Sequence, residues 1–371
     1  MDRKSFAIYA ITKHGVATAN KIKEDYPGAD LYVSKKLAHL APKDSLELPL
    51  PFSPMLKDSF PQYDCHIFVI SVGAVVRMIA PLLVNKKVDP AVLCIDDANR
   101  FTICVLSGHV GRGNEYTTAI ASCLDNEPVI TTASDAMGTL TVDILGRELG
   151  WTLEDQNHNV TKGCAAVVNE EPVAFVQECG EAHFWPLKKD LPTGVVYGES
   201  LDDLKPSKYG ILLIASDRDI VNGYPEHYKN AVVYRPKSLI VGMGCDRDTP
   251  MEILERGLLL NFKEFGLSIK SIKAIATVSL KANEKGLLAL CEKYDWQLID
   301  YTPEELDQVE GIENPSEVVK KYIGTRTVAE GAALKLSASA SLLVPKQKYK
   351  EDADGKNMTL AICRIPFAKR N

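Results

Sequence analysis

The chain has 371 residues, of which 46% are hydrophobic and 25% are charged, and its formal net charge is −6. This balance is typical of a globular protein with two or three domains, and the negative charge disfavours a general nucleic-acid binder. No segment approaches the ~20 apolar residues of a membrane span, and the nine cysteines form no CxxC pair, so we expect a cytoplasmic protein with reduced thiols and no contact with membranes.

The first part of the chain predicts strands that alternate with helices. Thr12 is suited to cap the first helix, and residues 41–62, which are rich in proline, indicate a loop. Asp96 and Asp97 begin a hairpin turn more plausibly than they form a catalytic pair. The alternation predicts a three-layer α/β domain with a mostly parallel sheet over residues 1–136. The expected strands are 6–11, 31–33, 66–72, 91–95, 101–106 and 129–132, and the expected helices are 12–25, 74–83 and 115–124.

The rhythm changes after residue 136, and we expect a smaller α+β middle domain over residues 137–236. Its predicted elements are a helix at 140–149 and strands at 165–168, 173–176, 211–215 and 232–234. Residues 237–371 return to a regular pattern that predicts a second α/β domain with a mostly parallel sheet. Its predicted strands are 238–243, 274–278, 297–301, 342–345 and 358–364, and its helices are 249–262, 283–294, 303–306 and 328–336.

The segment that follows the strand at 101–106 is the candidate reaction site. A strand, a glycine loop and a helix N-terminus together direct backbone N–H groups at an anion or a developing oxyanion. His109 is the candidate general base because imidazole titrates near neutral pH, and the alternative is a loop histidine bonded to the backbone. Asn114 is expected to cap the helix that starts at Glu115. The catalytic candidates are Ser107, His109, Asn114 and Glu115, and Gly108, Gly111, Arg112 and Gly113 complete the loop.

Other glycine and metal motifs fail when they are checked in detail. The G-x-x-x-x-G pattern that begins at Gly108 has Asn114 and Glu115 where a phosphate loop needs Lys and Ser or Thr. The run GMGCDR at 242–247 begins like a dinucleotide fingerprint, but Arg247 replaces the third glycine. Ser107 lacks the glycines of a nucleophile elbow, and the sequence contains no HExxH motif and no clustered His and Cys ligands. We therefore expect no metal site made by the protein.

Three further side chains are candidates for binding a ligand. Arg77 lies early in a predicted helix and is either a solvated surface residue or a carboxylate clamp, with Gly73 beside it. Arg247 is a second candidate clamp. Glu330 either caps a helix or faces a ligand.

Seven motifs follow one another along the chain: VGAVVRMIAP (72–81), KKVDPAV (86–92), LSGHVGRGNE (106–115), PVITTASD (128–135), VGMGCDR (241–247), SLKANE (279–284) and TVAEGAAL (327–334). Taken in this order, they resemble the cobalt-precorrin-5A hydrolase family of the anaerobic branch of cobalamin biosynthesis. The likeness runs nearly from end to end, and it implies an N-terminal catalytic-type domain, a middle domain and a C-terminal domain shared with a companion protein of the pathway. The chain departs from the usual family pattern at three positions: Arg112 and Gly113 replace Gly and Ala, and Asp248 replaces Gly.

The resemblance implies a reaction. Water opens the δ-lactone of a ring-contracted cobalt-tetrapyrrole, acetaldehyde leaves, and the product is cobalt-precorrin-5B. The cobalt arrives with the substrate, so no cofactor is expected. The acidic arms of this substrate need cationic clamps, and the expected binding residues are Gly73, Arg77, Gly108, Gly111, Arg112, Gly113, Arg247 and Glu330.

Alternatives to this reaction stay open at this point. His109 can be a cobalt ligand instead of a base. The whole chain can be a non-catalytic carrier that passes corrinoid intermediates between methyltransferases, or a nucleotide-binding regulator. Transient contact with corrinoid methyltransferases and a homodimer are the partners that we consider, and the sequence decides neither.

Overall fold

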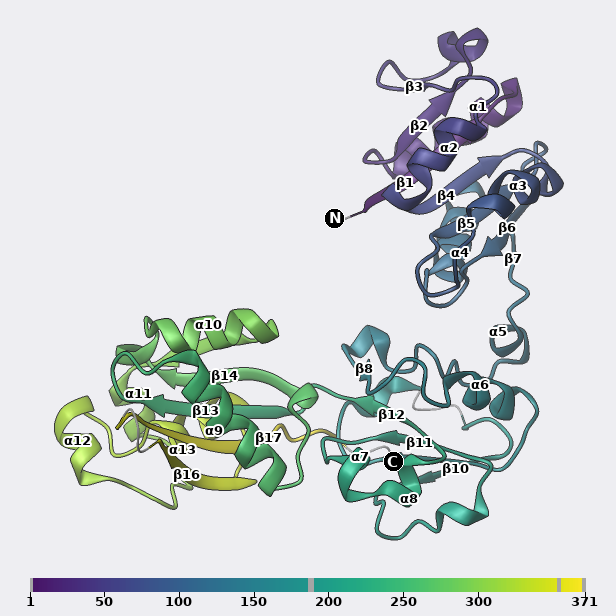
Figure 1. Cartoon of the computed structure of the whole chain (residues 1–371). Coiled ribbons are helices and arrows are strands. Elements are labelled where there is room, and N and C mark those ends of the chain that lie inside the picture. Colours follow the sequence, from purple (N-terminus) through teal and green to yellow (C-terminus); the bar gives the residue numbers. More distant parts are fainter. Residues whose placement is uncertain (1–2, 186–189, 352–354, 369–371) are drawn as a thin grey trace. The chain divides into compact units, whose positions relative to one another are not determined.

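The computed structural model describes residues 3–185, 190–351 and 355–368. The chain divides into two compact units, Met1–Ile144 and Leu145–Asn371, here called the N-terminal and C-terminal units. The described residues form three sheets, one in the first unit and two in the second (Figure 1). The sheets of the first unit and of the middle domain are mostly parallel, the C-terminal sheet is mixed, and all three are packed against helices, so the predicted α/β fold class is confirmed.

The N-terminal unit is built on a seven-stranded sheet with the order β3-β2-β1-β4-β5-β6-β7. Neighbouring strands are parallel except for β5 and β6, which form an antiparallel hairpin. The strands are β1 (Lys4–Ala10), β2 (Asp30–Val33), β3 (Leu46–Glu47), β4 (Tyr63–Val69), β5 (Ala91–Ile95), β6 (Phe101–Leu106) and β7 (Glu127–Val129). The helices are α1 (Lys13–Asp25), α2 (Ser53–Ser59), α3 (Val72–Ile79), α4 (Gly113–Leu124) and α5 (Ala133–Met137), with short 3-10 turns at Lys35–Leu40, Phe60–Gln62 and Ala80–Leu82.

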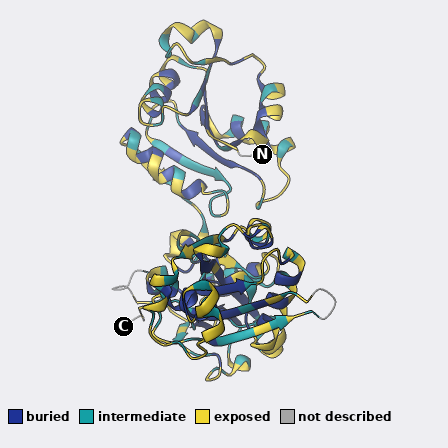
Figure 2. Ribbon diagram, turned by 90° about the vertical axis from the view of Figure 1, so that its left-hand side faces the viewer, coloured by how far each residue is buried: buried dark blue, intermediate teal, exposed yellow. Residues whose placement is uncertain are grey.

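Helices cover both faces of this sheet. Ile8 and Ile67 pack with side chains of α1 and α4 in one layer of the core, and Tyr9 and Phe68 pack with side chains of α2 and α3 in the other. The central strands are therefore continuous buried runs, as expected when both faces are covered (Figure 2). Thr12 caps α1 as predicted, because its side-chain oxygen accepts a hydrogen bond from the Gly15 amide at 2.9 Å.

The hairpin between β5 and β6 decides where the candidate loop lies. Asp96 forms the turn, and its Oδ1 accepts hydrogen bonds from the amides of Arg100 at 2.9 Å and Phe101 at 2.7 Å. The chain then runs back, so that Leu106 pairs with Val92 near the start of β5. The segment after β6 therefore begins at the end of the sheet where the amino ends of β1, β4 and β5 lie, opposite their carboxyl ends.

The C-terminal unit contains the middle sheet, with the order β10-β9-β11-β12-β8. Its strands are parallel except for β8, which is antiparallel to β12. The middle domain is thus closer to α/β than the predicted α+β. The strands are β8 (Thr152–Leu153), β9 (Val173–Gln177), β10 (Val195–Gly198), β11 (Ile211–Ala215) and β12 (Ala231–Arg235). The helices are α6 (Val160–Val168), α7 (Ile220–Gly223) and α8 (Pro225–Tyr228), with 3-10 turns at Arg147–Leu149, Ala182–Phe184 and Pro206–Lys208.

The C-terminal sheet has the order β15-β14-β13-β17-β16, with three parallel strands followed by an antiparallel pair. Leu254 of α9 and Leu287 of α10 pack on one face, and Leu306 of α11 and Ala332 of α13 pack on the other. The strands are β13 (Leu239–Cys245), β14 (Ile272–Val278), β15 (Gln297–Tyr301), β16 (Val344–Lys350) and β17 (Asn357–Arg364). The helices are α9 (Met251–Glu264), α10 (Lys285–Tyr294), α11 (Pro303–Asp307), α12 (Glu317–Ile323) and α13 (Ala329–Ser337), with 3-10 turns at Ile269–Ser271 and Ser279–Lys281.

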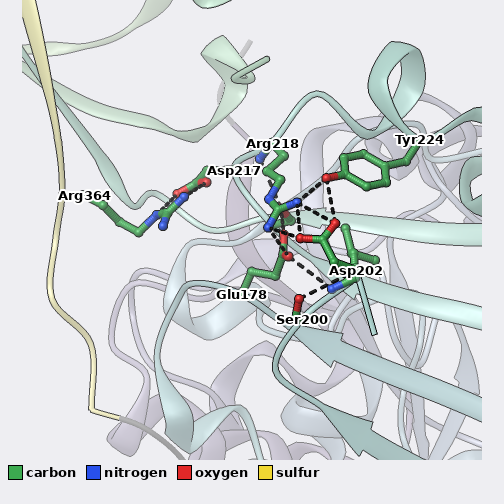
Figure 3. A network of polar contacts seen from close by, with 9 residues as sticks. Glu178, Ser200, Asp202, Asp217, Arg218, Tyr224 and Arg364 are labelled. Carbon is green, nitrogen blue, oxygen red and sulfur yellow. Dashed lines mark hydrogen bonds and ion pairs between the residues drawn. The ribbon is translucent and has the colours of Figure 1, made fainter. Parts of the chain in front are cut away.

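Ion pairs whose carboxylates are buried or nearly buried link the two sheets of the C-terminal unit. Arg364 of β17 donates to both carboxylate oxygens of Asp217, at 2.6 and 2.7 Å, and the Asp217 side chain is fully buried (Figure 3). Arg235 of β12 is also buried and donates to Glu154 at 2.5 Å, and Glu154 in turn pairs with Lys270 at 2.6 Å. The second half of the chain is thus held together by charge as well as by apolar packing.

Several segments differ from the prediction, which also lacked the elements α5, α7, α8, β8 and β10. Residues 165–168 lie in helix α6 and not in a strand, and the helix expected at 140–149 is reduced to the 3-10 turn Arg147–Leu149. The predicted loop at 41–62 contains β3 and α2, and helix α12 was not predicted. Short apolar runs fit a strand and a buried helix equally well, which explains the error at 165–168.

In the described part of the chain, we find no helix with the length and apolar character that crossing a membrane requires.

Candidate functional site

The loop after β6 is closed by its own backbone. Arg112 is the N-cap of α4 and has a left-handed φ of 63°, and Ser107 has a φ of 56°. The amides of Arg112, Gly113 and Asn114 donate to the carbonyls of His109, Ser107 and Gly108, each at 3.0 Å. The expectation that these amides are bare oxyanion donors is therefore wrong, as is the expectation that Asn114 caps a helix starting at Glu115.

Glycine is required in this loop because the chain folds tightly on itself. A Cβ atom at Gly108 would lie 2.6 Å from Oδ1 of Asn114, and one at Gly111 would lie 2.6 Å from Cβ of Ser107. At Gly113 it would lie 2.9 Å from the Leu106 carbonyl. These three glycines thus shape the loop.

His109 lies between two carboxylates. Its Nδ1 is 3.0 Å from Oδ1 and 3.2 Å from Oδ2 of Asp143, and its Nε2 is 2.8 Å from Oδ2 of Asp135. The hydroxyl of Ser134 also lies 3.1 Å from Nε2. The side chains of His109 and Asp143 are 13% and 14% exposed, whereas Asp135 is 38% exposed. Asp135 is therefore the end of the cluster that solvent or a substrate reaches most readily.

The electrostatics of this cluster favour the charged imidazolium. The hydrogen bond to Asp143 raises the pKa of His109 above its ordinary 6.5; burial opposes this shift, and Asp135 reinforces it. Burial acts to raise the pKa of Asp143, but the hydrogen bond and the charge of His109 outweigh burial, and the pKa falls below its ordinary 3.8. A neutral imidazole has one N–H for two carboxylates, so one nitrogen lone pair would face a negative oxygen. The geometry and the raised pKa of His109 thus both favour an imidazolium between the carboxylates of Asp135 and Asp143.

Asn114 joins the same cluster from the first turn of α4. Its Nδ2 donates at 2.9 Å both to Oγ1 of Thr132 and to Oδ2 of Asp135. Two buried polar atoms of the loop, Oγ of Ser107 and Oδ1 of Asn114, have no hydrogen-bond partner among the described residues. Buried polar atoms are nearly always satisfied, so such atoms are expected where a water or a ligand binds.

Arg112 and Glu115 are paired with each other at the surface. Nε of Arg112 donates to Oε2 of Glu115 at 2.8 Å, and NH2 of Arg112 lies 2.7 Å from the same atom. Both side chains are more than 40% exposed. This i,i+3 pair is adjacent in sequence to the His109 cluster.

Gly73 and Arg77 lie at the other edge of the sheet. Both belong to α3, which follows the carboxyl end of β4, whereas the candidate loop follows the reversed strand β6. About five residues of strand, or roughly 16 Å, separate these two edges. The guanidinium of Arg77 donates to the carbonyl of Gly73 at 2.9 Å, and the side chain is exposed. The structure therefore does not bring these two residues together with His109.

Arg247 and Glu330 lie in the C-terminal unit. Arg247 is 64% exposed and lies 3.8 Å from the buried carboxylate of Glu284. Glu330 is fully buried and accepts hydrogen bonds from the amides of Glu313, Asn314 and Lys346 at 2.8 to 3.0 Å. Glu330 thus joins the segment before α12 to strand β16, a contact that the sequence did not predict.

The glycines of GMGCDR also have a packing role. Gly242 and Gly244 lie within β13 and not in a loop after it. A Cβ atom at Gly242 would lie 1.8 Å from the carbonyl oxygen of Ala329, so glycine is needed for α13 to pack against the strand. This run is therefore not a phosphate-binding turn.

Sequence reasoning missed Asp135, Asp143 and Ser134. Asp135 lies a few residues after strand β7, at the end of the TTASD run. Its position soon after a strand could have indicated a candidate site residue. Asp143 is 34 residues from His109 in the chain and lies in a segment predicted to be helical. Within the residues that the structure describes, no group of three or more His, Cys, Asp or Glu side chains is arranged to hold a metal ion.

Comparisons with known proteins agree on one family. Three family models match the chain: Cobalamin synthesis G N-terminal at residues 54–135, Cobalamin biosynthesis central region at 140–236 and Cobalamin synthesis G C-terminus at 239–363. The cobalt-precorrin-5A hydrolase of Priestia megaterium is 38% identical over 98% of this chain and 96% of its own length. The enzyme of the same name from Salmonella typhimurium is 29% identical over 90% of this chain and 92% of its own length.

A solved structure also aligns along the whole chain. It is a cobalamin biosynthesis protein G homolog from Sulfolobus solfataricus, with 18% identity, 98% coverage of each chain and a TM-score of 0.36. The family assignment depends on the sequence relatives, whose identity extends over nearly the full length of both chains. The chain therefore belongs to the cobalt-precorrin-5A hydrolase family of cobalamin biosynthesis.

Proposed function

We propose that the chain hydrolyses cobalt-precorrin-5A to cobalt-precorrin-5B with release of acetaldehyde, and that it uses no cofactor beyond the cobalt within its substrate. Relatives that bear the name of this hydrolase match the chain over nearly its whole length. The observation that carries the proposal is the Asp135–His109–Asp143 cluster, which is an acid–base unit beside a loop with unsatisfied buried polar atoms.

The proposed reaction needs both a proton acceptor and a proton donor. Water attacks the lactone carbonyl and loses a proton, the C–O bond to the ring oxygen breaks, and that oxygen takes a proton. The freed hydroxyl then loses its proton as the C–C bond to the macrocycle breaks. Acetaldehyde leaves, and the electron pair and a proton remain on the macrocycle. One water is consumed and no oxidant or reductant is needed.

We assign these roles to the cluster as a whole instead of to a lone imidazole base. Asp135, the most exposed member, accepts a proton from water and later from the hydroxyl. The imidazolium of His109 donates a proton and offsets developing negative charge. Asp143 keeps the imidazole charged and oriented from the buried side, as the aspartate of a catalytic triad does.

The test is an assay of the purified full chain with cobalt-precorrin-5A, in which acetaldehyde is measured through a coupled reductase. His109→Gln should lower the rate by about 10²- to 10⁴-fold, the usual contribution of a general acid–base group. His14→Gln is a matched control, because His14 is an exposed histidine of α1 in the same unit and should leave the rate unchanged.

Other outcomes separate the alternatives. If His109→Gln keeps the full rate, the acid–base roles assigned to the cluster are wrong. A shift of the corrinoid spectrum on binding that disappears in His109→Gln indicates cobalt ligation by His109. A tight complex that forms without any acetaldehyde indicates a carrier, and the proposed reaction is then wrong.

A further inference from the structure

A second candidate site lies in the C-terminal sheet, within the C-terminal unit. A cavity of about 510 Å³ opens at the carboxyl ends of β13 and β14, with Cys245 and Val278 in its wall. In open α/β sheets, ligands bind outside the carboxyl ends of parallel strands. The cavity therefore has the position and size that are usual for a small-molecule site.

The cavity wall is cationic in a chain of negative net charge. Asp246 is the one acidic residue of the described lining, and its Oδ2 is already bonded to the amide and side chain of Asn357 at 2.8 and 2.9 Å. The cationic residues of the lining are Arg247, Lys281, Arg326, Lys346 and Lys348.

Acids behind the wall neutralise these cations only in part. The buried Glu284 lies 3.0 Å from Lys281 but 3.8 Å from Arg247, and Asp307 lies 3.7 Å from Arg326. Arg247 and Arg326 are 64% and 48% exposed. Lys348 is exposed on β16. At least three cationic side chains can thus turn toward an anionic ligand in the cavity.

One wall of the same cavity is apolar. Val318 and Tyr322 are one turn apart on α12, and they are 67% and 73% exposed. Large exposed apolar side chains that gather at a cavity mark a surface to be covered. A tyrosine beside an aliphatic side chain is suited to a flat ring system, because an aromatic ring contributes a large contact area at low entropic cost.

Glu330 fixes the relation of the cationic wall to the α12 wall. Its buried carboxylate binds the amide of Lys346, on β16, and the amide of Asn314, just before α12. The ammonium of Lys346 also donates to the Asn314 carbonyl. The cavity is thus a built site, in which a buried charge holds two of its sides.

We propose that this cavity binds a planar ligand that carries several carboxylates, with Tyr322 and Val318 against the ring face and Arg247, Arg326 and Lys348 on the carboxylates. The identification of that ligand as the cobalt-tetrapyrrole substrate or product rests on the proposed function. The cavity takes an edge of the macrocycle and its acidic arms, and so contributes affinity and not chemistry.

The probe for this site is uroporphyrin, a metal-free planar tetrapyrrole with eight carboxylates, titrated into the full chain and followed by fluorescence anisotropy. The double variant Arg326→Gln, Lys348→Gln should weaken binding about tenfold. Tyr322→Ser should weaken it several-fold. Lys350→Gln is the matched control, since Lys350 is an exposed lysine of the same strand outside the cavity lining, and it should bind as the unchanged chain does.

Further measurements identify the kind of ligand that the cavity binds. Coproporphyrin, which has four carboxylates, should bind more weakly than uroporphyrin, and both should lose affinity as salt rises. ATP in excess should not displace the porphyrin. Unchanged affinity in the cavity variants, equal weakening by Lys350→Gln, or displacement by ATP would overturn the proposal.

The failure of this proposal differs from the failure of the proposed function. If the chain releases acetaldehyde but the cavity variants bind uroporphyrin as tightly as the unchanged chain, the proposed function stands and the proposed binding site is wrong. If the cavity variants weaken binding but the chain releases no acetaldehyde, the binding site stands and the proposed function is wrong.

Discussion

A histidine between two carboxylates has a different chemistry from a histidine alone in a loop. His109 was identified from its sequence neighbours as a base, and the structure gives it Asp143 on one nitrogen and Asp135 on the other. This geometry stabilises the protonated ring and moves the accepting role to a carboxylate. The residue type and the loop could be predicted from sequence, but the protonation state could not, because it depends on a side chain 34 residues away.

The Asp143 contact predicts a pH dependence of stability. The raised pKa of His109 means that its pairing stabilises the fold fully below about pH 6.5 and that this contribution is lost as pH rises through the raised value. The lowered pKa of Asp143 means that its contribution is present above about pH 3.8 and is lost as pH falls through the lowered value. Asp143→Asn should therefore lower the free energy of unfolding by about 2 kcal/mol between these limits, and by less outside them.

Urea unfolding at a series of pH values measures this difference. The same variant should lower the rate of acetaldehyde release by about 10²-fold or more, because the imidazole loses the group that orients it. A stability difference that is constant from pH 4 to pH 9 would contradict the pairing. Asp44→Asn is a suitable control, since Asp44 pairs with Lys23 at the surface and is 64% exposed.

Two departures from the family's sequence pattern have a backbone explanation. The resemblance led us to note Arg112 and Asp248 where glycine is commoner. Both residues adopt left-handed backbone angles, with φ of 63° and 57°, which glycine tolerates without steric cost. The positions were visible in the sequence, but the reason for the glycine became clear only from the backbone.

At the scale of elements, the hydrophobic pattern predicted the positions of strands well but did not predict whether a strand is parallel or antiparallel to its neighbours. The bounds of β5 and β6 agree with the prediction, as does the turn at Asp96. The pattern did not show which edge of the sheet the loop after β6 would join, because an antiparallel strand can carry the same apolar residues as a parallel one. For that reason Arg77 and His109 were grouped in one site, and the fold separates them.

The contact of β13 with α13 gives a prediction about packing. Gly242→Ala would place a methyl group 1.8 Å from the Ala329 carbonyl oxygen, where backbone and not a flexible side chain must move. We expect a loss of about 3 kcal/mol in the free energy of unfolding, measured by urea denaturation. Gly223→Ala is the control: it has no atom within 4 Å of the added carbon and should be neutral or slightly stabilising. Equal stability of the two variants would contradict this account of the packing.

At the scale of the whole molecule, the second half of the chain combines two sheets in one compact unit. Apolar periodicity predicted both sheets in outline. It gave no sign of the ion pairs that join them, since Asp217 and Arg364 are 147 residues apart in the sequence. Contacts of this kind depend on the tertiary arrangement and have no local pattern.

The Asp217–Arg364 pair predicts how this half unfolds. Asp217→Asn leaves a partly buried guanidinium without its carboxylate, and we expect a loss of about 3 kcal/mol together with less cooperative unfolding of the two sheets. Arg256→Gln is the control, because Arg256 is 51% exposed in its pair with Glu351, and its loss should leave the transition nearly unchanged. Differential scanning calorimetry measures both effects, and a single unshifted transition in Asp217→Asn would contradict the prediction.

Asp143 lies almost at the end of the first compact unit, after the family model of the N-terminal part has stopped at residue 135 and that of the central part has begun at 140. A fragment cut at residue 136, where the sequence suggested a boundary, would carry the histidine and leave one of its two counter-ions behind. A fragment of the first half made for titration or crystallisation should therefore extend through residue 144. In the shorter fragment His109 would lack Asp143, and its proton affinity would differ from that in the full chain.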